Sequence, residues 1–508
     1  MSDAARDDGR GPASAAQPPA ETSAPPETPE TPETPETPET PETPETPETP
    51  ETPETPETPE TGGCPGDPGV TRGTGTPALL TPGAEPWPYL TADVPAVAGT
   101  LKARYEDFVV EEIPLYAPEG RGDHVHFVIE KAGLTTHKAV ADIARALGVR
   151  PRDIGLAGLK DARAVTRQTL SVEHVDPDRV ASLELPRIRV LSVARHPRKL
   201  RVGHLSGNRF RIRLRDVDAA RIDDVRRVLD VLARRGVPNY FGAQRFGVRG
   251  DTAEIGRRLI AGDVDGAVAL IAGRPGPNDT GAVLEARTAF EAGDYAAAAE
   301  LWPRAYAAHA RLSRAMAREK GNARRAIRAL DRRMLRLLVN AYQSWIFNQV
   351  LARRIDTLDR LFDGDLAVKH ATGGIFRVDD ATAEQPRADR FEISPTGPLP
   401  GAEMRRAEGA PGAIEEEVLR DAGRRLEDFP STGPFRVTGG RRALRFPLRD
   451  VAVEPGSDEA GSYLEFRFTL PPGCYATAVL REVCKDRLAG VTPDAGEADG
   501  GEADESRR

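Results

Sequence analysis

The stretch that decides the fold is Ala157-Gly-Leu-Lys-Asp-Ala-Arg-Ala-Val-Thr-Arg-Gln168, in which Gly158 gives backbone freedom beside the Lys160–Asp161 pair. It leads into an alternating segment, Thr169 to Val175, that predicts a strand. A short acidic side chain in a glycine-hinged loop beside a strand is where many folds put a catalytic carboxylate. A surface Lys-Asp turn is the plainer interpretation, and the residues alone favour it.

Charge is spread unevenly along the chain. The 508 residues, enough for two or more domains, carry a formal net charge of −9. Residues 1–62 hold 16 acidic side chains against two arginines, and residues 488–508 hold six against two. The region between them, Gly63 to Arg487, therefore has a net charge of +9. A basic folded part suits an anionic partner such as RNA.

The N-terminal region is of low complexity, because Pro26 to Thr61 repeats Pro-Glu-Thr almost without interruption. Proline removes hydrogen-bond donors and the glutamates repel one another, so we expect a disordered arm outside the active region. The three cysteines form no Cys-x-x-Cys, which suits a reducing compartment. No apolar run approaches the roughly 20 residues that span a bilayer, and no apolar signal-peptide core is present. We expect a cytoplasmic protein without a membrane partner.

From about Tyr89 the sequence is typical of a globular protein. Alternating apolar residues predict strands in Gly99 to Ile113, Asp123 to Glu130, Asn208 to Arg215 and Leu464 to Leu470. Apolar residues at helical spacing predict helices from a Thr135 or Thr136 cap to Gly148, and at Ala220 to Arg235, Arg332 to Ile355, Glu415 to Leu426 and Ala476 to Lys485. Runs of both kinds point to an α+β protein.

Two segments have both a structural and a functional interpretation. Arginine alternates with apolar residues from Arg209 to Arg215, which predicts either a solvated sheet face or a row that binds phosphates. Asn239-Tyr-Phe-Gly-Ala-Gln-Arg-Phe-Gly247 could stack on a nucleic acid, but we favour a loop that fills a domain junction.

A rival hypothesis is a DNA-binding helix-turn-helix in Leu134 to Lys160, with a turn at Leu147-Gly148-Val149. The second segment, from Asp153, contains two glycines and lacks a row of base-reading side chains. The DNA-binding regulator is therefore the alternative, and we expect no DNA partner.

Five motifs in order give the chain a resemblance to the tRNA pseudouridine synthase D (TruD) family. They are Glu106-Asp-Phe-Val-Val-Glu111, Gly158-Leu-Lys-Asp-Ala-Arg-Ala-Val-Thr-Arg-Gln168, Gly207-Asn-Arg-Phe210, Asn239-Tyr-Phe-Gly-Ala-Gln-Arg-Phe-Gly247 and Phe468-Thr-Leu-Pro-Pro-Gly-Cys-Tyr-Ala-Thr-Ala-Val-Leu-Arg-Glu482. The resemblance covers about Gly99 to Lys485, and both acidic ends lie outside it.

The resemblance implies the site. The family's catalytic Asp maps to Asp161, and Phe108, Asn208 and Tyr475 then line the uridine pocket, the last of these often being Phe in relatives. Supporting residues would be Lys160, which could hold Asp161 ionised or point to phosphate, together with Phe210 and Lys102. No metal or organic cofactor is expected. Whether Asp161 attacks the sugar carbon or removes a ribose proton stays open.

The resemblance also implies the architecture: a pseudouridine synthase-type catalytic domain with a mixed or antiparallel sheet and helices, interrupted by a second α/β domain. The expected division is a disordered tail at 1–88, catalytic segments at 89–235 and 446–487, an insertion at 236–445 and an acidic tail at 488–508. The expected function is isomerisation of a tRNA uridine, most of all uridine 13 of the D arm, to pseudouridine by a monomer.

Overall fold

The computed structural model of the chain describes residues 87–431, 433 and 435–490. Apart from their borders, the two acidic ends for which the sequence predicts disorder lie outside these residues. Trp87 is buried and stacks on Tyr240 with ring centroids 5.9 Å apart, and Leu488–Ala489 forms strand β16. The expected borders at residues 88 and 488 therefore lie a little inside the fold.

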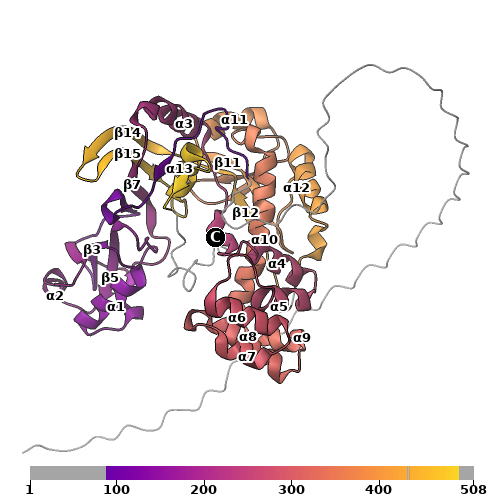
Figure 1. Cartoon of the computed structure of the whole chain (residues 1–508). Helices are drawn as coiled ribbons and strands as arrows, with labels where there is room; N and C mark the ends of the chain where they lie inside the picture. Colours follow the sequence, from indigo (N-terminus) through magenta and orange to yellow (C-terminus); the bar gives the residue numbers. More distant parts are fainter. Residues whose placement is uncertain (1–86, 432, 434, 491–508) are drawn as a thin grey trace, which may run out of the picture. The chain divides into compact units, whose positions relative to one another are not determined.

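A mixed sheet, ten-stranded within the described residues, forms the left part of the view in Figure 1, with a main path β14–β15–β7–β2–β5–β3–β6. Its strands are β1 (Gly99–Thr100), β2 (Phe108–Pro114), β3 (His124–Ala132), β4 (Gly155–Leu156), β5 (Val165–Glu173), β6 (Ile188–His196), β7 (Leu205–Arg215), β14 (Arg449–Asp458), β15 (Gly461–Leu470) and β16. Strand β2 pairs antiparallel with β7 and parallel with β5. The strands predicted at Asp123 to Glu130, Asn208 to Arg215 and Leu464 to Leu470 are confirmed, and so is the α+β class. The strand predicted over Gly99 to Ile113 is divided into β1 and β2, with a 3-10 turn at Tyr105–Asp107 between them.

Helices cover one face of each half of this sheet (Figure 1). They are α1 (Thr136–Leu147), α2 (Pro177–Ala181), α3 (Ile222–Arg235) and α13 (Ala476–Cys484). Thr135 caps α1 by accepting from Lys138 N, and Gly148 ends it in the left-handed conformation, as predicted. The apolar stripe of α1 packs on β3 and β5, whereas α3 and α13 pack on β7 and β15.

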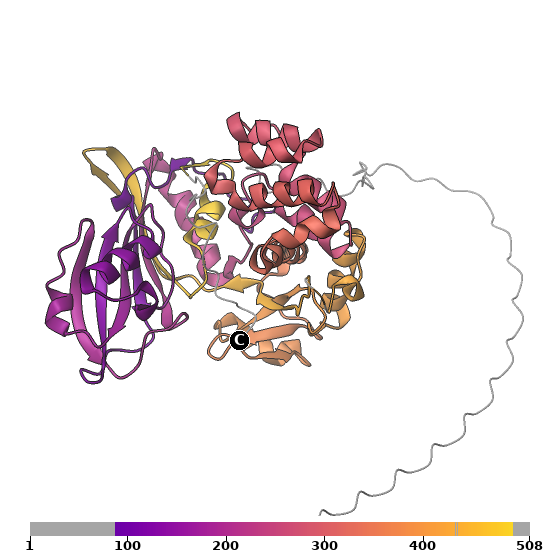
Figure 2. The same cartoon turned by 90° about the horizontal axis from the view of Figure 1, so that it is seen from below.

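The chain leaves the ten-stranded sheet and its helices at β8 (Val237–Pro238) and returns to them at β13 (Arg445–Phe446), and these two strands pair with each other. Between them, a helical core surrounds α10 and a four-stranded sheet has the order β10–β9–β11–β12 (Figure 2). The helices are α4 (Thr252–Ile260), α5 (Val264–Ala272), α6 (Gly281–Glu291), α7 (Tyr295–Leu301), α8 (Ala307–Arg318), α9 (Ala323–Ala326), α10 (Arg332–Arg353), α11 (Ala381–Asp389) and α12 (Gly409–Asp421). The strands are β9 (Leu366–Lys369), β10 (Ile375–Arg377), β11 (Ile393–Leu399) and β12 (Gly440–Ala443). The division into domains stays a prediction.

The helix-turn-helix hypothesis is wrong. Helix α1 exists, but the segment after it is a short 3-10 turn, Pro151–Asp153, followed by strand β4. Gly155 has no room for a side chain, because a Cβ there would lie 2.4 Å from the Leu200 carbonyl oxygen and 2.5 Å from Ser171 Oγ. Of the two glycines that argued against a recognition helix, Gly155 lies in β4 and allows it to pair closely with β5.

Carboxylates compensate the arginine row of β7. Arg211 and Arg213 approach Glu465 of β15 at 3.5 and 3.0 Å, and Arg209 approaches Glu111 of β2 at 3.5 Å. Arg215 departs from the predicted solvated face, because it is buried and holds Asp107 at 2.6 Å and Asp458 at 2.7 Å. Cross-strand ion pairs of this kind favour the structural interpretation over a row that binds phosphates.

The Asn239 segment packs against α10 and the end of β12, and its place at a domain junction stays a prediction. Asn239 Nδ2 donates to the Ala443 carbonyl, and the backbone N–H and C=O of Phe241 both bond to the Asn348 side chain of α10. Tyr240 and Phe246 are buried. Within the described residues, no helix is both long and apolar enough for a membrane crossing.

Candidate active site

The loop between β4 and β5 presents Asp161 beside a lysine from another part of the chain. Lys102, just after β1, places its Nζ 3.2 Å from Asp161 Oδ2. The same ammonium lies 4.4 Å from the ring centroid of Phe108, the first residue of β2. The Asp161 side chain is 33% exposed, so the carboxylate is held by a cation while one side stays open to a substrate.

Lys160 does not pair with Asp161. Its Nζ lies 2.6 Å from Glu112 Oε2, and the two side chains are 5% and 1% exposed. Glu112 also accepts a hydrogen bond from Thr169 N at 3.2 Å. Of the two roles considered for Lys160, holding Asp161 ionised is therefore wrong, and Lys102 occupies that place. Lys160 anchors the loop to β2.

Two further buried side chains fix the loop backbone. Lys131 of β3 donates to the Asp161 carbonyl oxygen at 3.0 Å and to that of Leu134 at 2.6 Å. Thr136, the first residue of α1, accepts from Lys160 N at 2.9 Å and approaches Gln168 Oε1 at 3.1 Å. A buried ammonium on a carbonyl makes a strong hydrogen bond, so the backbone around Asp161 is rigid before any substrate binds.

Register in the sheet gathers the remaining site residues on one face. Along β2 and β7, Val110 is opposite Phe210 and Glu112 is opposite Asn208. The Phe108 and Phe210 rings meet edge to face at 6.1 Å, and Phe210 lies 5.5 Å from Phe468 of β15. Successive side chains of a strand point to opposite faces of the sheet. One face therefore carries four of these residues, Phe108, Glu112, Phe210 and Asn208, and Lys160 approaches this same face through its contact with Glu112.

Asn208 is buried, and among the described residues its Oδ1 has no hydrogen-bond partner. A buried amide oxygen without a donor is costly unless a ligand supplies one. The oxygen therefore lacks a donor among the described residues, and we keep contact with a bound base as a prediction.

Tyr475 precedes α13 and is 56% exposed. It follows Leu470, which is the β15 partner of Asn208, by five positions along the chain. The structure thus brings Asp161, Lys102, Phe108 and Phe210 together and gives Asn208 a place on the same sheet face. It leaves the role of Tyr475 a prediction.

Glu112 and the two residues that fix the loop were not found from the sequence. Glu112 had a usable signal, since it alternates with Phe108 and Val110 and so belongs to the buried face of β2. A carboxylate at such a position requires a cation. Lys131 and Thr136 gave no comparable signal, because their bonds go to backbone atoms distant in the sequence.

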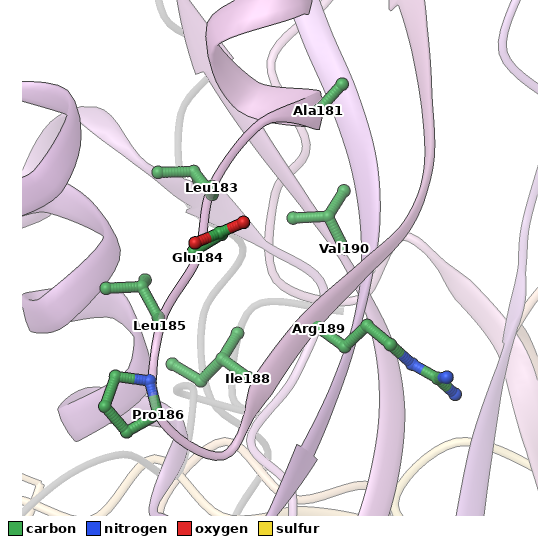
Figure 3. A pocket seen from close by; sticks show the side chains of 8 residues that line it. All are labelled: Ala181, Leu183, Glu184, Leu185, Pro186, Ile188, Arg189 and Val190. Atoms are coloured by element: carbon green, nitrogen blue, oxygen red, sulfur yellow. The ribbon is translucent and has the colours of Figure 1, made fainter.

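A depression on the surface lies elsewhere (Figure 3). Its walls come from the end of α2, the segment after it and the first part of β6, and include Leu183, Leu185 and Val190. Its charged side chains are Glu184 and Arg189, and none of the predicted site residues lines it. It offers no carboxylate–lysine pair next to aromatic rings, and we do not regard it as the active site.

The arrangement around Asp161 suits chemistry at an electron-poor carbon. A fixed, partly exposed carboxylate can stabilise or attack such a centre, or accept a proton from it. Phe108 lies beside it but is only 2% exposed, with the Lys102 ammonium 4.4 Å from its ring centroid, so its contact with a base stays a prediction. Lys102 keeps the carboxylate in position.

Comparison with known proteins agrees with this chemistry. The family described as tRNA pseudouridine synthase D (TruD) matches residues 87–483. The tRNA pseudouridine synthase D of Geobacter sulfurreducens is 46% identical over 401 residues, covering 78% of this chain and 96% of that protein. The protein of the same name from Geobacter metallireducens is 47% identical, with 78% and 97% covered.

A solved structure shows the same fold. A crystal structure from Methanosarcina mazei, of a protein provisionally assigned as tRNA pseudouridine synthase D (TruD), superposes with a TM-score of 0.70 at 29% identity, covering 79% of this chain and 96% of that one. With a family match over most of its length and relatives above 40% identity, the chain belongs to the tRNA pseudouridine synthase D (TruD) family.

Proposed function

We propose that the chain isomerises a uridine of tRNA, uridine 13 of the D arm, to pseudouridine, with Asp161 as the catalytic carboxylate. The observation that carries this proposal is the contact of Asp161 with Lys102, whose ammonium also lies against Phe108. Family membership supports the reaction class. The particular uridine and the role of Asp161 are our inference.

The reaction breaks the bond between uracil N1 and ribose C1′ and forms one between uracil C5 and the same carbon. The proton on C5 is lost, N1 gains one, and no electrons are exchanged with a cofactor. When N1 departs, C1′ becomes electron-poor, as in glycoside cleavage. Asp161 then either bonds to C1′ or removes a ribose proton, and both routes need the carboxylate ionised and close to the sugar.

The neighbouring residues would receive the base. A uridine in folded RNA must be flipped out, which costs a few kcal/mol, and packing on Phe108 and Tyr475 offsets part of that cost. The free Oδ1 of Asn208 would accept the uracil N3–H, and this bond distinguishes uracil from cytosine, whose N3 carries no hydrogen. We further propose a monomer that acts in the cytoplasm, where tRNA is available.

Replacing Asp161 by Asn tests the proposal. Purified full-length protein is incubated with unmodified tRNA, and pseudouridine is mapped at single-nucleotide resolution. We expect Asp161→Asn to lower turnover by at least about 10³-fold while tRNA binding persists, because the amide keeps the shape and loses the charge. Asp178→Asn, an exposed aspartate on α2, is the matched control and should remain active.

Two results would count against the proposal in different ways. Full activity in Asp161→Asn would remove Asp161 from the chemistry. Product at another nucleotide, or unchanged product from a tRNA with cytidine at position 13, would leave the enzyme class in place and overturn the choice of target.

A further inference from the structure

The segment from Arg304 to Arg336 concentrates positive charge that the uridine site does not use. Eleven Lys and Arg side chains stand there against two carboxylates, Glu319 and Asp331, which gives a net charge of +9. All eleven are exposed. Gly63 to Arg487 as a whole also has a net charge of +9, so the rest of that region is neutral overall. We call the exposed face of this segment the basic surface.

Local folding gathers these residues in one place. Helix α8 contacts both α9 and the 3-10 turn Ile327–Ala329 that precedes α10. Arg311 of α8 lies 3.6 Å from Asp331 at the start of α10, and Arg325 of α9 lies 3.8 Å from Glu319 at the end of α8. The alanines and other apolar residues of the segment are largely turned into the helical core, so the arginines face outward together.

Most of this charge has no counterion among the residues that the structure describes. Only three of the eleven cations make ion pairs among the described residues, at 3.6 to 3.8 Å, and the other eight, Arg318, Arg324 and Arg328 among them, make none there. The arginines of β7 differ, since each has a carboxylate within 3.5 Å. The arginines of β7 are therefore neutralised by ion pairs, whereas most cations of the basic surface have no ion pair among the described residues.

The start of α10 contributes two of these cations, Arg332 and Arg333, in a first turn that contains no acidic residue. The helix end itself is already capped, because the Asp331 carboxylate accepts a hydrogen bond from Met334 N at 2.7 Å. The two arginines therefore add to the charge of the basic surface, and the helix N-terminus is not a separate anion site.

We propose that the basic surface binds the sugar-phosphate backbone of the substrate tRNA, as a second contact besides the uridine site. This rests on the proposed function, which supplies RNA as the partner. Guanidinium groups on phosphates supply affinity and orientation without reading sequence. The acidic Pro-Glu-Thr arm is the other anionic candidate, but it offers one charge for every three residues, whereas RNA offers one phosphate for every nucleotide. Charge density therefore favours RNA.

The test removes four unpaired cations from the full-length chain. The surface variant is Arg318→Gln, Arg324→Gln, Arg328→Gln and Arg332→Gln. The matched control, with the same loss of charge from exposed arginines that have carboxylates nearby, is Arg121→Gln, Arg226→Gln, Arg227→Gln and Arg425→Gln. Both are compared with the parent by tRNA binding over a range of salt concentrations and by steady-state kinetics, after circular dichroism has confirmed folding.

We expect the surface variant to bind tRNA at least tenfold more weakly at low salt. The slope of the logarithm of the binding constant against the logarithm of the salt concentration should be smaller in magnitude by about 1 for each phosphate that the variant no longer neutralises. KM should rise and kcat stay within about twofold, because the uridine site is intact. The control should match the parent. If the fourfold variant fails to fold, Lys320→Gln with Arg324→Gln should show the same changes to a smaller extent; Lys320 is exposed in the turn between α8 and α9, and Arg324 is exposed in the first turn of α9.

An unchanged affinity and salt slope in a folded surface variant would overturn the proposal. A second outcome that overturns it assigns the surface to the arm: once the twelve glutamates of Pro26 to Thr61 have become glutamine, the surface substitutions no longer change tRNA affinity or its salt dependence. Because binding is measured apart from turnover, tRNA binding through this surface without any pseudouridine product would refute the proposed function and leave this inference standing.

Discussion

Breaking the buried Lys160–Glu112 pair should be among the most damaging changes near the site. Its atoms are 2.6 Å apart and both side chains are almost fully buried. At an effective dielectric constant of about 20, the attraction at that distance is about 6 kcal/mol, and the desolvation of two ions cancels much of it. Removing one partner forfeits the attraction and leaves the other charge buried, which costs about 3–5 kcal/mol.

A double-mutant cycle separates the pair from its surroundings. Lys160→Met and Glu112→Gln should each lower the free energy of unfolding by about 3–5 kcal/mol, whereas the double variant should recover about 2–4 kcal/mol of the summed loss. Gln retains an oxygen for Thr169 N, so that bond is not lost with the charge. Urea denaturation at constant pH provides the free energies, and single-turnover pseudouridine formation provides the rates.

The rates test whether Lys160 acts only through the loop. If it positions Asp161 and does not touch RNA, the double variant should regain most of the turnover that each single variant loses, because the loop is again free of an unpaired charge. Single variants that lose less than about 1 kcal/mol, or a coupling energy near zero, would refute the reasoning about the pair. A stable but inactive double variant would show that the Lys160 ammonium is needed by the substrate.

Three further predictions concern single residues. Lys102→Gln should lower kcat by about 10²-fold, because the Lys102 cation holds Asp161 in position. Lys102→Arg keeps the charge and should retain more activity. Equal single-turnover rates for the parent and Lys102→Gln would contradict this role. Asn208→Leu should raise the free energy of unfolding by about 1 kcal/mol in urea denaturation, because it deletes a buried amide oxygen without a partner among the described residues. It should also lower kcat/KM for tRNA by about tenfold or more, because uracil needs that oxygen. If stability and kcat/KM both rise or both fall, the result would argue against uracil recognition by Asn208. Burial, reinforced by Arg287 and Arg249, lowers the pKa of His309 from 6.5 to about 4, so the folded state binds fewer protons than the unfolded state and stability is lost as pH falls between these values. The parent should lose about 2 kcal/mol more than His309→Gln between pH 7 and pH 5 in urea titrations, and parallel losses would refute the assignment.

The sequence was informative where local signals suffice. Helix α1 has a threonine cap, a regular apolar stripe and a terminal glycine, and the structure confirms all three. Strand β7 alternates cleanly, so both its existence and the burial of Phe210 and Ile212 could be predicted. These features depend on residues close together in the chain, and each signal agrees with the others.

Partners distant in the sequence could not be predicted. Nothing in the alternation of β7 shows that Arg215 is buried, because its partners Asp107 and Asp458 come from opposite ends of the folded chain. Lys160 is the nearest cation to Asp161 in sequence, yet Lys102 is its neighbour in space. Helix α12 begins at Gly409, earlier than the predicted Glu415, although its first turn contains Gly409 and Pro411, which oppose a helix in isolation.

The pairing of β7 with β15 has a consequence for how the protein is made. Contacts across this pair, such as Arg213 with Glu465, join residues 252 positions apart. A ribosome adding about 5–20 residues per second therefore needs on the order of 10–50 seconds between synthesising one strand and its neighbour. During that interval β7 is an unprotected edge, open to chaperones or to mispairing. The sheet that carries Phe108 and Asn208 is complete only when β14 and β15 have been synthesised. A nascent chain, or one truncated before these strands, therefore lacks a complete active site.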